Sequence, residues 1–160
     1  MPQSLSELFA PERIKTNLEA EDKPEVFEEL VDFLALRYGL SCKDRILEAI
    51  CRREEKMSTG IKRGIAIPHA KIDVTKGIIG VLGISRKGID YESLDGEPVR
   101  LLFLLVSSES AAVSHLSALK RIALLADVPD FYTQMLAAET PEEANQIIAR
   151  HEAGLAASDV

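Results

Sequence analysis

The spacing of apolar residues predicts a first long helix early in the chain. It is expected to begin after Asp22, a residue type that often caps helix N-termini, with Pro24 in its first turn. Apolar residues then recur at helical spacing up to Tyr38, as on the buried face of an amphipathic helix. Gly39 is expected to end this helix, since glycine readily adopts the left-handed conformation of a helix C-terminus.

A second helix is expected directly afterwards. Ser41 and Asp44 have the spacing of a capping box, in which two side chains cap the first turn of a helix. The apolar face of this helix consists of Ile46, Leu47, Ile50 and Cys51. We expect the helix to end near Arg53 or Glu55.

Four other stretches have the pattern of β-strands. Residues 14–18 alternate apolar and polar positions, which is typical of a half-exposed strand. Residues 65–67 form a short apolar run, and residues 78–84 are apolar on both faces, as in an inner strand. Residues 99–106 form the most apolar stretch, so we expect them to be the central strand.

The last third of the chain is again helical by its spacing. One helix is expected over residues 111–127, and a short helix opens at Pro129. Thr140 and Glu143 have capping-box spacing, and Pro141 follows Thr140 in the first turn. These residues predict the start of a final helix.

Helices, then strands, then helices predict a single α/β domain with a mixed β-sheet flanked by helices. A chain of 160 residues is long enough for one sizeable core. We expect the domain to span residues 1–153 and residues 154–160 to form a frayed tail. Since no apolar run could span a bilayer and no signal-peptide pattern opens the chain, we expect a cytoplasmic protein that is not inserted in a membrane.

Charge is distributed unevenly along the chain. The net charge of −7 argues against a general nucleic-acid binder. Residues 52–76 nevertheless contain seven cations and three anions, and the cations gather around His69. A solvated basic loop would explain any single cation, but the cluster as a whole indicates a segment that handles phosphate.

His69 lies within this basic segment, directly after a proline. Pro68 has a fixed φ and favours an extended conformation at Ile67, so the strand at residues 65–67 is expected to stop at His69. A neutral imidazole is a good nucleophile near pH 7, because its unperturbed pKa is about 6.5. The arrangement predicts a histidine that reacts with an anionic group.

The segment at residues 53–69 also resembles a known signature. It reads R-E-E-K-M-S-T-G-I-K-R-G-I-A-I-P-H and is similar to the active-site segment of the mannitol/fructose-type enzyme IIA proteins, the PTS EIIA type-2 family of the bacterial phosphoenolpyruvate-dependent phosphotransferase system. The turn D-G-E-P-V at residues 95–99 and the sequence S-H-L-S-A-L at residues 114–119 resemble this family as well. The resemblance covers residues 5–151 and implies a phosphotransferase that forms a phosphohistidine.

The resemblance implies roles for three residues. His69 matches the histidine that accepts a phosphoryl group from the histidine-containing phosphocarrier protein. Arg53 matches an arginine that supports the phosphorylated site, and His115 matches the second active-site histidine. The sequence departs from the usual pattern of the family at two points, and both concern the shape of the loop. Ala70 stands where the family often has glycine, and Lys62–Arg63 adds charge.

The partners that the resemblance implies are proteins. After transfer to His69, the phosphoryl group would pass to a IIB component and on to a sugar. In a nitrogen-regulatory branch of the family, the protein instead reports its phosphorylation state to other proteins. We expect partners to dock transiently on a shallow, partly apolar patch near His69 that includes Ile61 and Ile65.

The chemistry also fits the residue types without the resemblance. Phosphoryl transfer depends on positioning and on stabilisation of the charge on the phosphoryl oxygens. The guanidinium of Arg53 can donate two hydrogen bonds at once to a pair of these oxygens. Neutral donors are expected in the loop formed by Ser58, Thr59 and Gly60. His115 can orient the acceptor ring, at a hydrogen-bond distance of about 2.6–3.2 Å or through one water. This chemistry requires no metal and no cofactor.

Other interpretations are open for the same residues. Arg53 alone could satisfy the end of its helix, and His115 alone could be a core histidine. A metal site of His69, His115 and Asp73 is one alternative, although their spacing has no metal signature. A regulatory binding module that acts by protein contact and is never phosphorylated is another.

Overall fold

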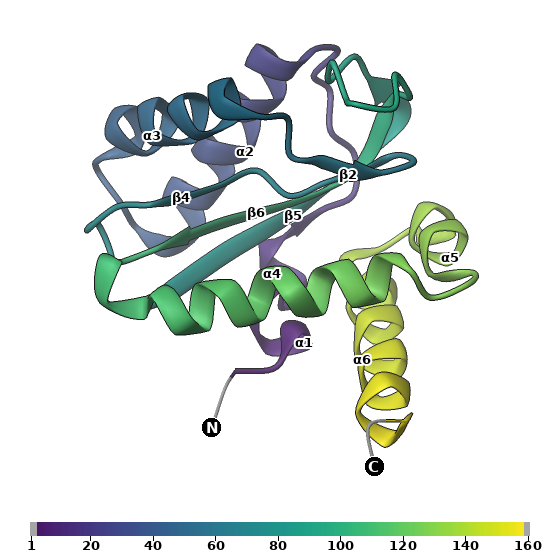
Figure 1. The fold of residues 1–160 in the computed structure, drawn as a ribbon. Coiled ribbons are helices and arrows are strands. Elements are labelled where there is room, and N and C mark those ends of the chain that lie inside the picture. Colours follow the sequence, from purple (N-terminus) through teal and green to yellow (C-terminus); the bar gives the residue numbers. More distant parts are fainter. Residues whose placement is uncertain (1–2, 159–160) are drawn as a thin grey trace.

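Six strands form one mixed sheet in the computed structural model, which describes residues 3–158 (Figure 1). The strands are β1 (Ile14–Lys15), β2 (Gly60–Lys62), β3 (Ile65–Ala66), β4 (His69–Lys71), β5 (Ile78–Ile89) and β6 (Val99–Ser107). Their order is β1-β5-β6-β3-β2, and β4 pairs with β6 further along the same edge as β3. β5 runs antiparallel to β6, whereas β3 and β4 run parallel to it.

The most apolar stretch, β6, is the central strand, as predicted. It is hydrogen-bonded to β5 on one side and to β3 and β4 on the other. Leu101, Phe103 and Leu105 belong to one core cluster, and the residues that alternate with them belong to another. Because both faces of the strand are covered, residues 101–106 are all apolar.

Helices cover both faces of the sheet (Figure 1). α2 (Lys23–Tyr38) and α3 (Lys43–Lys56) pack on one face. The other face carries α1 (Leu5–Leu8), α4 (Ala112–Ala126), α5 (Phe131–Ala137) and α6 (Pro141–Ser158). Short 3-10 turns at Pro11–Arg13 and Glu109–Ala111 precede β1 and α4. The prediction of an α/β domain with a mixed sheet flanked by helices is therefore confirmed.

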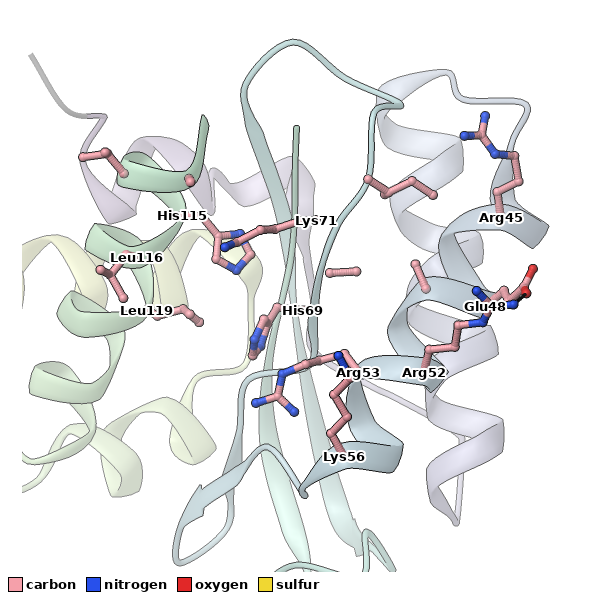
Figure 2. A pocket seen from close by; sticks show the side chains of 15 residues that line it. Arg45, Glu48, Arg52, Arg53, Lys56, His69, Lys71, His115, Leu116 and Leu119 are labelled. Carbon is pink, nitrogen blue, oxygen red and sulfur yellow. Dashed lines mark ion pairs between the residues drawn. The ribbon is translucent and has the colours of Figure 1, made fainter. Parts of the chain in front are cut away.

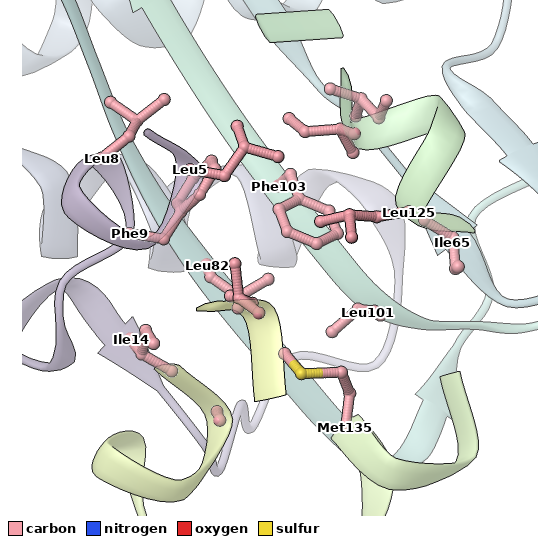
Figure 3. Close-up of a cluster of buried hydrophobic side chains, with 14 of the residues drawn as sticks. Leu5, Leu8, Phe9, Ile14, Ile65, Leu82, Leu101, Phe103, Leu125 and Met135 are labelled. Atoms are coloured by element: carbon pink, nitrogen blue, oxygen red, sulfur yellow. The ribbon is translucent and has the colours of Figure 1, made fainter. Parts of the chain in front are cut away.

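The core cluster under α1 and α4 contains a contact between two phenylalanine rings (Figure 3). The rings of Phe9 and Phe103 meet edge to face, with centroids 5.2 Å apart. Leu5, from α1, and Leu125, from α4, close the same cluster. This packing fixes α4 against the sheet, and α4 carries one of the candidate site residues. Within residues 3–158, no helix is long and apolar enough to cross a membrane.

Two predicted helix caps are confirmed and one is wrong. The carboxylate of Asp22 accepts an N–H in the first turn of α2, and the hydroxyl of Thr140 does so in α6. α3 instead begins after Cys42, whose side chain makes no capping hydrogen bond. The predicted capping box of Ser41 and Asp44 therefore fails, because such a box needs its first member at the N-cap position.

Several boundaries also differ from the predictions. β1 has only two residues, and α3 continues to Lys56. Gly60–Lys62 forms β2 where a loop was expected, because Gly64, with φ of 79°, turns the chain back onto β3. α6 continues to Ser158, beyond the expected domain end at residue 153, and residues 159–160 lie outside the described part of the chain.

Candidate functional site

A hollow of about 820 Å³ lies between α3 and α4, beside β4 (Figure 2). One wall carries four of the cations that line it, which are Arg45, Arg52, Arg53 and Lys56 of α3. The opposite wall is apolar and consists of Ala112, Val113, Leu116 and Leu119 of α4. Among the described residues that line this hollow, Glu48 is the only carboxylate, and it is paired with Arg52 at 2.5 Å. The hollow is thus strongly basic in a chain of negative net charge.

His69 lies between these walls, at the start of β4. The prediction that it ends a strand is wrong, because β3 stops at Ala66, Ile67 and Pro68 interrupt the pairing with β6, and His69 opens β4. The chain rejoins β6 at His69, which pairs in register with Leu105. The carbonyl of Pro68 accepts the N–H of Leu105 at 3.0 Å, so the segment stays against β6 across the break. The ring is therefore held on a rigid strand and remains half-buried.

The ring of His69 is oriented by a backbone hydrogen bond. Its Nδ1 lies 2.8 Å from the carbonyl oxygen of Ile67. A carbonyl can only accept, so Nδ1 carries the proton and the lone pair lies on Nε2. Burial lowers the pKa of His69, and the positive charge of Arg53 and Lys71 also lowers it, against the raising effect of the Ile67 hydrogen bond and of Glu54. The neutral, nucleophilic form is therefore favoured.

His115 lies beside His69, in the first turns of α4. The ring centroids are 5.2 Å apart with an interplanar angle of 61°, so the rings meet edge to face, and Figure 2 shows them next to each other. Among the described residues, no direct hydrogen bond joins the two rings. Nδ1 of His115 instead lies 2.6 Å from the hydroxyl of Ser107, and its Nε2 is buried with no hydrogen-bond partner in the described part of the chain. Burial, together with the charges of His69 and Lys71, lowers the pKa of His115 to about 4.

Arg53 lies in the last turn of α3, next to His69. Its Nη1 donates to the carbonyl of Met57 at 3.0 Å, as expected of an arginine that satisfies a helix end. The same guanidinium also lines the basic hollow with His69. Arginine has five N–H donors, so the bond to Met57 leaves others for a ligand. The two interpretations of Arg53 are therefore compatible.

The loop that was expected to supply neutral donors is largely occupied. Thr59 is buried, and both its N–H and its hydroxyl donate to the carboxylate of Glu54. The N–H of Gly60 lies 3.2 Å from the hydroxyl oxygen of Ser58. Thr59 and Gly60 thus serve the loop itself in this structure, and the hydroxyl proton of Ser58 is a side-chain donor that a ligand could use. The spacing of residues does not show that Glu54 folds back on this loop.

A second hollow, of about 410 Å³, lies on the other side of His69. Its rim carries exposed apolar side chains, which are Met57, Ile61 and Leu94. Ile61 is 41% exposed, but Ile65 is only 1% exposed because β3 lies inside the sheet. The expected docking patch therefore excludes Ile65. Leu94 was not singled out from the sequence, because it belongs to a turn with no apolar pattern.

The alternative metal site has no support in the arrangement of side chains. Within residues 3–158, no group of three or more histidine, cysteine, aspartate or glutamate side chains is placed to hold a metal ion. The carboxylate of Asp73 accepts the N–H of Glu109 at 3.1 Å, at the turn before α4. The structure thus brings together His69, His115 and Arg53, but gives Asp73 a different partner.

The sequence is similar to those of known proteins over most of its length. Residues 7–151 match the family described as phosphoenolpyruvate-dependent sugar phosphotransferase system, EIIA 2. The chain is 38% identical over 148 residues to the fructose-specific EIIABC component of a PTS system in Bacillus subtilis, which covers 92% of this chain but only 23% of that protein. It is 33% identical over 145 residues to a nitrogen regulatory protein of Bradyrhizobium diazoefficiens, which covers 91% of this chain and 94% of that one.

The fold is similar to a solved structure as well. The crystal structure of nitrogen regulatory protein IIA-Ntr from Neisseria meningitidis superposes with a TM-score of 0.83. The two chains are 28% identical, and the alignment covers 90% of this chain and 98% of that one. Sequence and fold therefore point to the same group of proteins as the residues of the site.

Proposed function

The chain belongs to the EIIA 2 family of the phosphoenolpyruvate-dependent sugar phosphotransferase system, and we propose that its His69 accepts a phosphoryl group from the histidine-containing phosphocarrier protein and passes it on. The observation that carries this proposal is the hydrogen bond from Nδ1 of His69 to the carbonyl of Ile67. It leaves the Nε2 lone pair as the nucleophile, within a hollow lined by cations. In this role the protein is a phosphotransferase that forms a phosphohistidine.

In the transfer, the Nε2 lone pair of His69 attacks the phosphorus atom. A new N–P bond forms while the bond between phosphorus and the donor's histidine nitrogen breaks, and that nitrogen regains its electron pair. Nδ1 keeps its proton and its bond to Ile67, so the ring carries positive charge beside the phosphoryl anion. Arg53 and Lys71 supply further positive charge where the phosphoryl oxygens lie.

His115 completes this site by holding the phosphoryl group without carrying it. If the hydroxyl of Ser107 donates to Nδ1 of His115, the proton of that ring lies on Nε2. That Nε2 is buried and has no hydrogen-bond partner within residues 3–158, which suits a donor reserved for a phosphoryl oxygen. The low pKa of His115 keeps the ring neutral, so its contribution is a hydrogen bond and not a second cation.

The partners in this proposal are the phosphocarrier protein as donor and either a IIB component or a regulatory target as acceptor. The name of the EIIABC relative supports a IIB acceptor, and the nitrogen regulatory relative supports a regulatory target. Donor and acceptor would dock in turn on the apolar rim formed by Met57, Ile61 and Leu94. The cytoplasmic location stays a prediction from the sequence.

A labelling experiment tests the proposal. The protein is incubated with isotopically labelled phosphoenolpyruvate, enzyme I and the phosphocarrier protein, and the bound label is measured. Wild type should take up label in a bond that is stable to base and labile to acid. His69→Ala should take up none, whereas His115→Ala should take it up more slowly. His151→Ala is the control, because His151 lies on α6 and contacts Gln134.

A regulatory module that is never phosphorylated is the alternative function. The nitrogen regulatory relatives favour a regulatory role. The presence of both His69 and Arg53 at the hollow favours a regulatory role that depends on phosphorylation. A wild-type protein that takes up no label in the same assay, while the phosphocarrier protein does, would support the alternative and overturn the proposal.

A further inference from the structure

Glu54 is a buried carboxylate beside the site that the proposed chemistry does not use. Its residue is 7% exposed, and no other acidic side chain is buried in the part of the chain that the structure describes. A buried carboxylate without partners is strongly unfavourable, so a residue of this type is kept in the interior by its hydrogen bonds and ion pairs. These contacts show which segments the carboxylate holds together.

Both carboxylate oxygens of Glu54 are engaged. Oε1 accepts the hydroxyl of Thr59 at 2.6 Å and that of Tyr91 at 3.2 Å. Oε2 accepts the N–H of Thr59 at 3.0 Å and pairs with Nζ of Lys23, also at 3.0 Å. Nζ of Lys23 lies 4.7 Å from the centroid of the Tyr91 ring. The last turn of α3 is thereby tied to the start of α2, the segment after β5 and the loop of residues 57–60.

Two hydrogen bonds lead from this network to His69. The carbonyl of Thr59, which Glu54 holds by its N–H and hydroxyl, accepts the N–H of Ile67 at 3.0 Å. The carbonyl of Ile67 in turn accepts Nδ1–H of His69 at 2.8 Å. The position of the Ile67 carbonyl decides which ring nitrogen of His69 keeps the proton. The tautomer of the acceptor therefore depends on where Glu54 holds Thr59.

The same loop also fixes Arg53. Nη1 of Arg53 donates to the carbonyl of Met57, which lies two residues before Thr59. Arg53 and Glu54 are consecutive residues of α3. Arg53 is hydrogen-bonded to the loop at Met57, and Glu54 at Thr59. A loop released by Glu54 would leave the guanidinium without its backbone anchor.

We propose that Glu54 is the positioning residue of the site. Its hydrogen bonds hold the loop of residues 57–60 in place, and this loop fixes the orientation of both the His69 ring and the Arg53 guanidinium. The expected effect of Glu54 on the rate of phosphoryl transfer rests on the proposed function of His69. The hold of Glu54 on the two side chains is a property of the fold and can be measured without any transfer.

The test uses Glu54→Gln, with Glu55→Gln as the matched control. Glutamine keeps the size of the side chain, but its amide nitrogen cannot accept the bonds that one carboxylate oxygen accepts now. Glu55 is the next residue of α3 and is exposed, so its change should have no effect. Two quantities are measured: the rate of phosphoryl transfer, and the imidazole ¹⁵N chemical shifts of His69, which report its tautomer.

We expect Glu54→Gln to stay folded and to slow transfer by roughly 10- to 100-fold, as found when a reacting group is displaced by about 1 Å. The ¹⁵N shifts should show a larger share of the Nε2–H tautomer of His69. Thr59→Val should act in the same direction, Thr59→Ser should restore wild-type behaviour, and Glu54→Gln combined with Thr59→Val should be no slower than Glu54→Gln alone. Should Glu54→Gln fail to fold, Tyr91→Phe removes one bond to the carboxylate and tests the same shifts.

Unchanged ¹⁵N shifts of His69 in a folded Glu54→Gln protein would overturn the inference, whatever the transfer rate. Additive effects of the Glu54 and Thr59 changes on the transfer rate would overturn it too. These results are distinct from a failure of the proposed function, which would appear as a wild-type protein that takes up no label. In that case the shifts of His69 would still show whether Glu54 sets its tautomer.

Discussion

His69 and His115 carry the same ring in different surroundings, and this difference assigns their roles. His69 is half-buried, with Nδ1 bound to a backbone carbonyl and Nε2 beside a hollow. His115 is 1% exposed, and Ser107 is hydrogen-bonded to one of its ring nitrogens while the other has no partner among the residues that the structure describes. The first arrangement suits a nucleophile that partners can reach, and the second suits a buried hydrogen-bond donor.

The buried position of His115 predicts a dependence of stability on pH. Its pKa is about 4 in the folded protein, against an ordinary value of 6.5. Between these values the unfolded chain binds more protons, so the stability present above pH 6.5 is lost as the pH falls toward 4. The lowered pKa of His69 acts in the same direction. For His115 the loss is on the order of 3 kcal/mol, since one pKa unit corresponds to about 1.4 kcal/mol.

Urea denaturation of wild type and His115→Gln at neutral pH and near pH 4.5 checks this prediction. The free energy of unfolding should fall with pH in both proteins, because carboxylates also titrate, but it should fall less in the variant. An equal fall in both proteins would show that His115 does not couple folding to protonation.

At the scale of elements, the last turn of α3 carries the largest share of the site. It presents Arg53 to the hollow and Glu54 to the loop of residues 57–60. The turn is followed by β2 and β3, which lead to the break at Pro68 and to His69. One helix end and one strand start thus meet, and the loop between them is fixed by hydrogen bonds on both sides.

Arg53→Ala should slow phosphoryl transfer while leaving the fold intact. The side chain is only partly buried, so little packing is lost, but one charged hydrogen-bond donor to the phosphoryl group disappears. Such an interaction contributes about 1.5–3 kcal/mol, or roughly one to two decades in rate. Stopped-flow or quench kinetics of label uptake, with circular dichroism as the check on folding, measure the effect. Wild-type kinetics in the Arg53→Ala protein would show that Arg53 only satisfies the end of α3 through its bond with Met57.

The sequence predicts the structure correctly where the structure depends on residues that lie close together in the chain. Asp22 predicts the start of α2, and the apolar stretch of residues 99–106, unbroken from 101 to 106, predicts the central strand, because capping and burial on both faces leave local patterns. The failures involve contacts between distant segments. The bond from Ile67 to Thr59, and that from Thr59 to Glu54, have no periodic pattern, so β2, the break before β4 and the occupied donors of the loop were missed.

The candidate site shows the same division. His69, Arg53 and His115 could be nominated from their residue types and from the resemblance of two segments. Their meeting depends on β4 and α4 flanking β6, which the residues alone do not give. Glu54 was overlooked because an acid among basic residues at a helix end has the pattern of an exposed helix face.

At the scale of the molecule, the charge distribution predicts that transfer depends on salt. The net charge is −7, yet five cations among the described residues line the hollow at His69. This local field should attract a phosphorylated, anionic donor site and raise the association rate. Salt screens such fields, with a Debye length of about 10 Å at 0.1 M and about 3 Å at 1 M.

We therefore expect kcat/KM for uptake from the phosphocarrier protein to fall several-fold as sodium chloride is raised over this range, with kcat changing less. Arg45→Gln should weaken this dependence, since Arg45 is an exposed cation at the far end of the hollow (Figure 2). Lys120→Gln, an exposed cation of α4 outside the hollow, is the matched control. Rates that rise with salt would contradict the role given to these cations.

The most direct test of the account is to locate the phosphoryl group on the protein by NMR. The protein is phosphorylated through enzyme I and the phosphocarrier protein, and ³¹P and ¹⁵N spectra are recorded with ¹⁵N-labelled histidine. The account predicts one phosphohistidine, at Nε2 of His69, because Nδ1 of that ring is bound to Ile67. A phosphoryl group on Nδ1 of His69, on His115, or on a serine would contradict it.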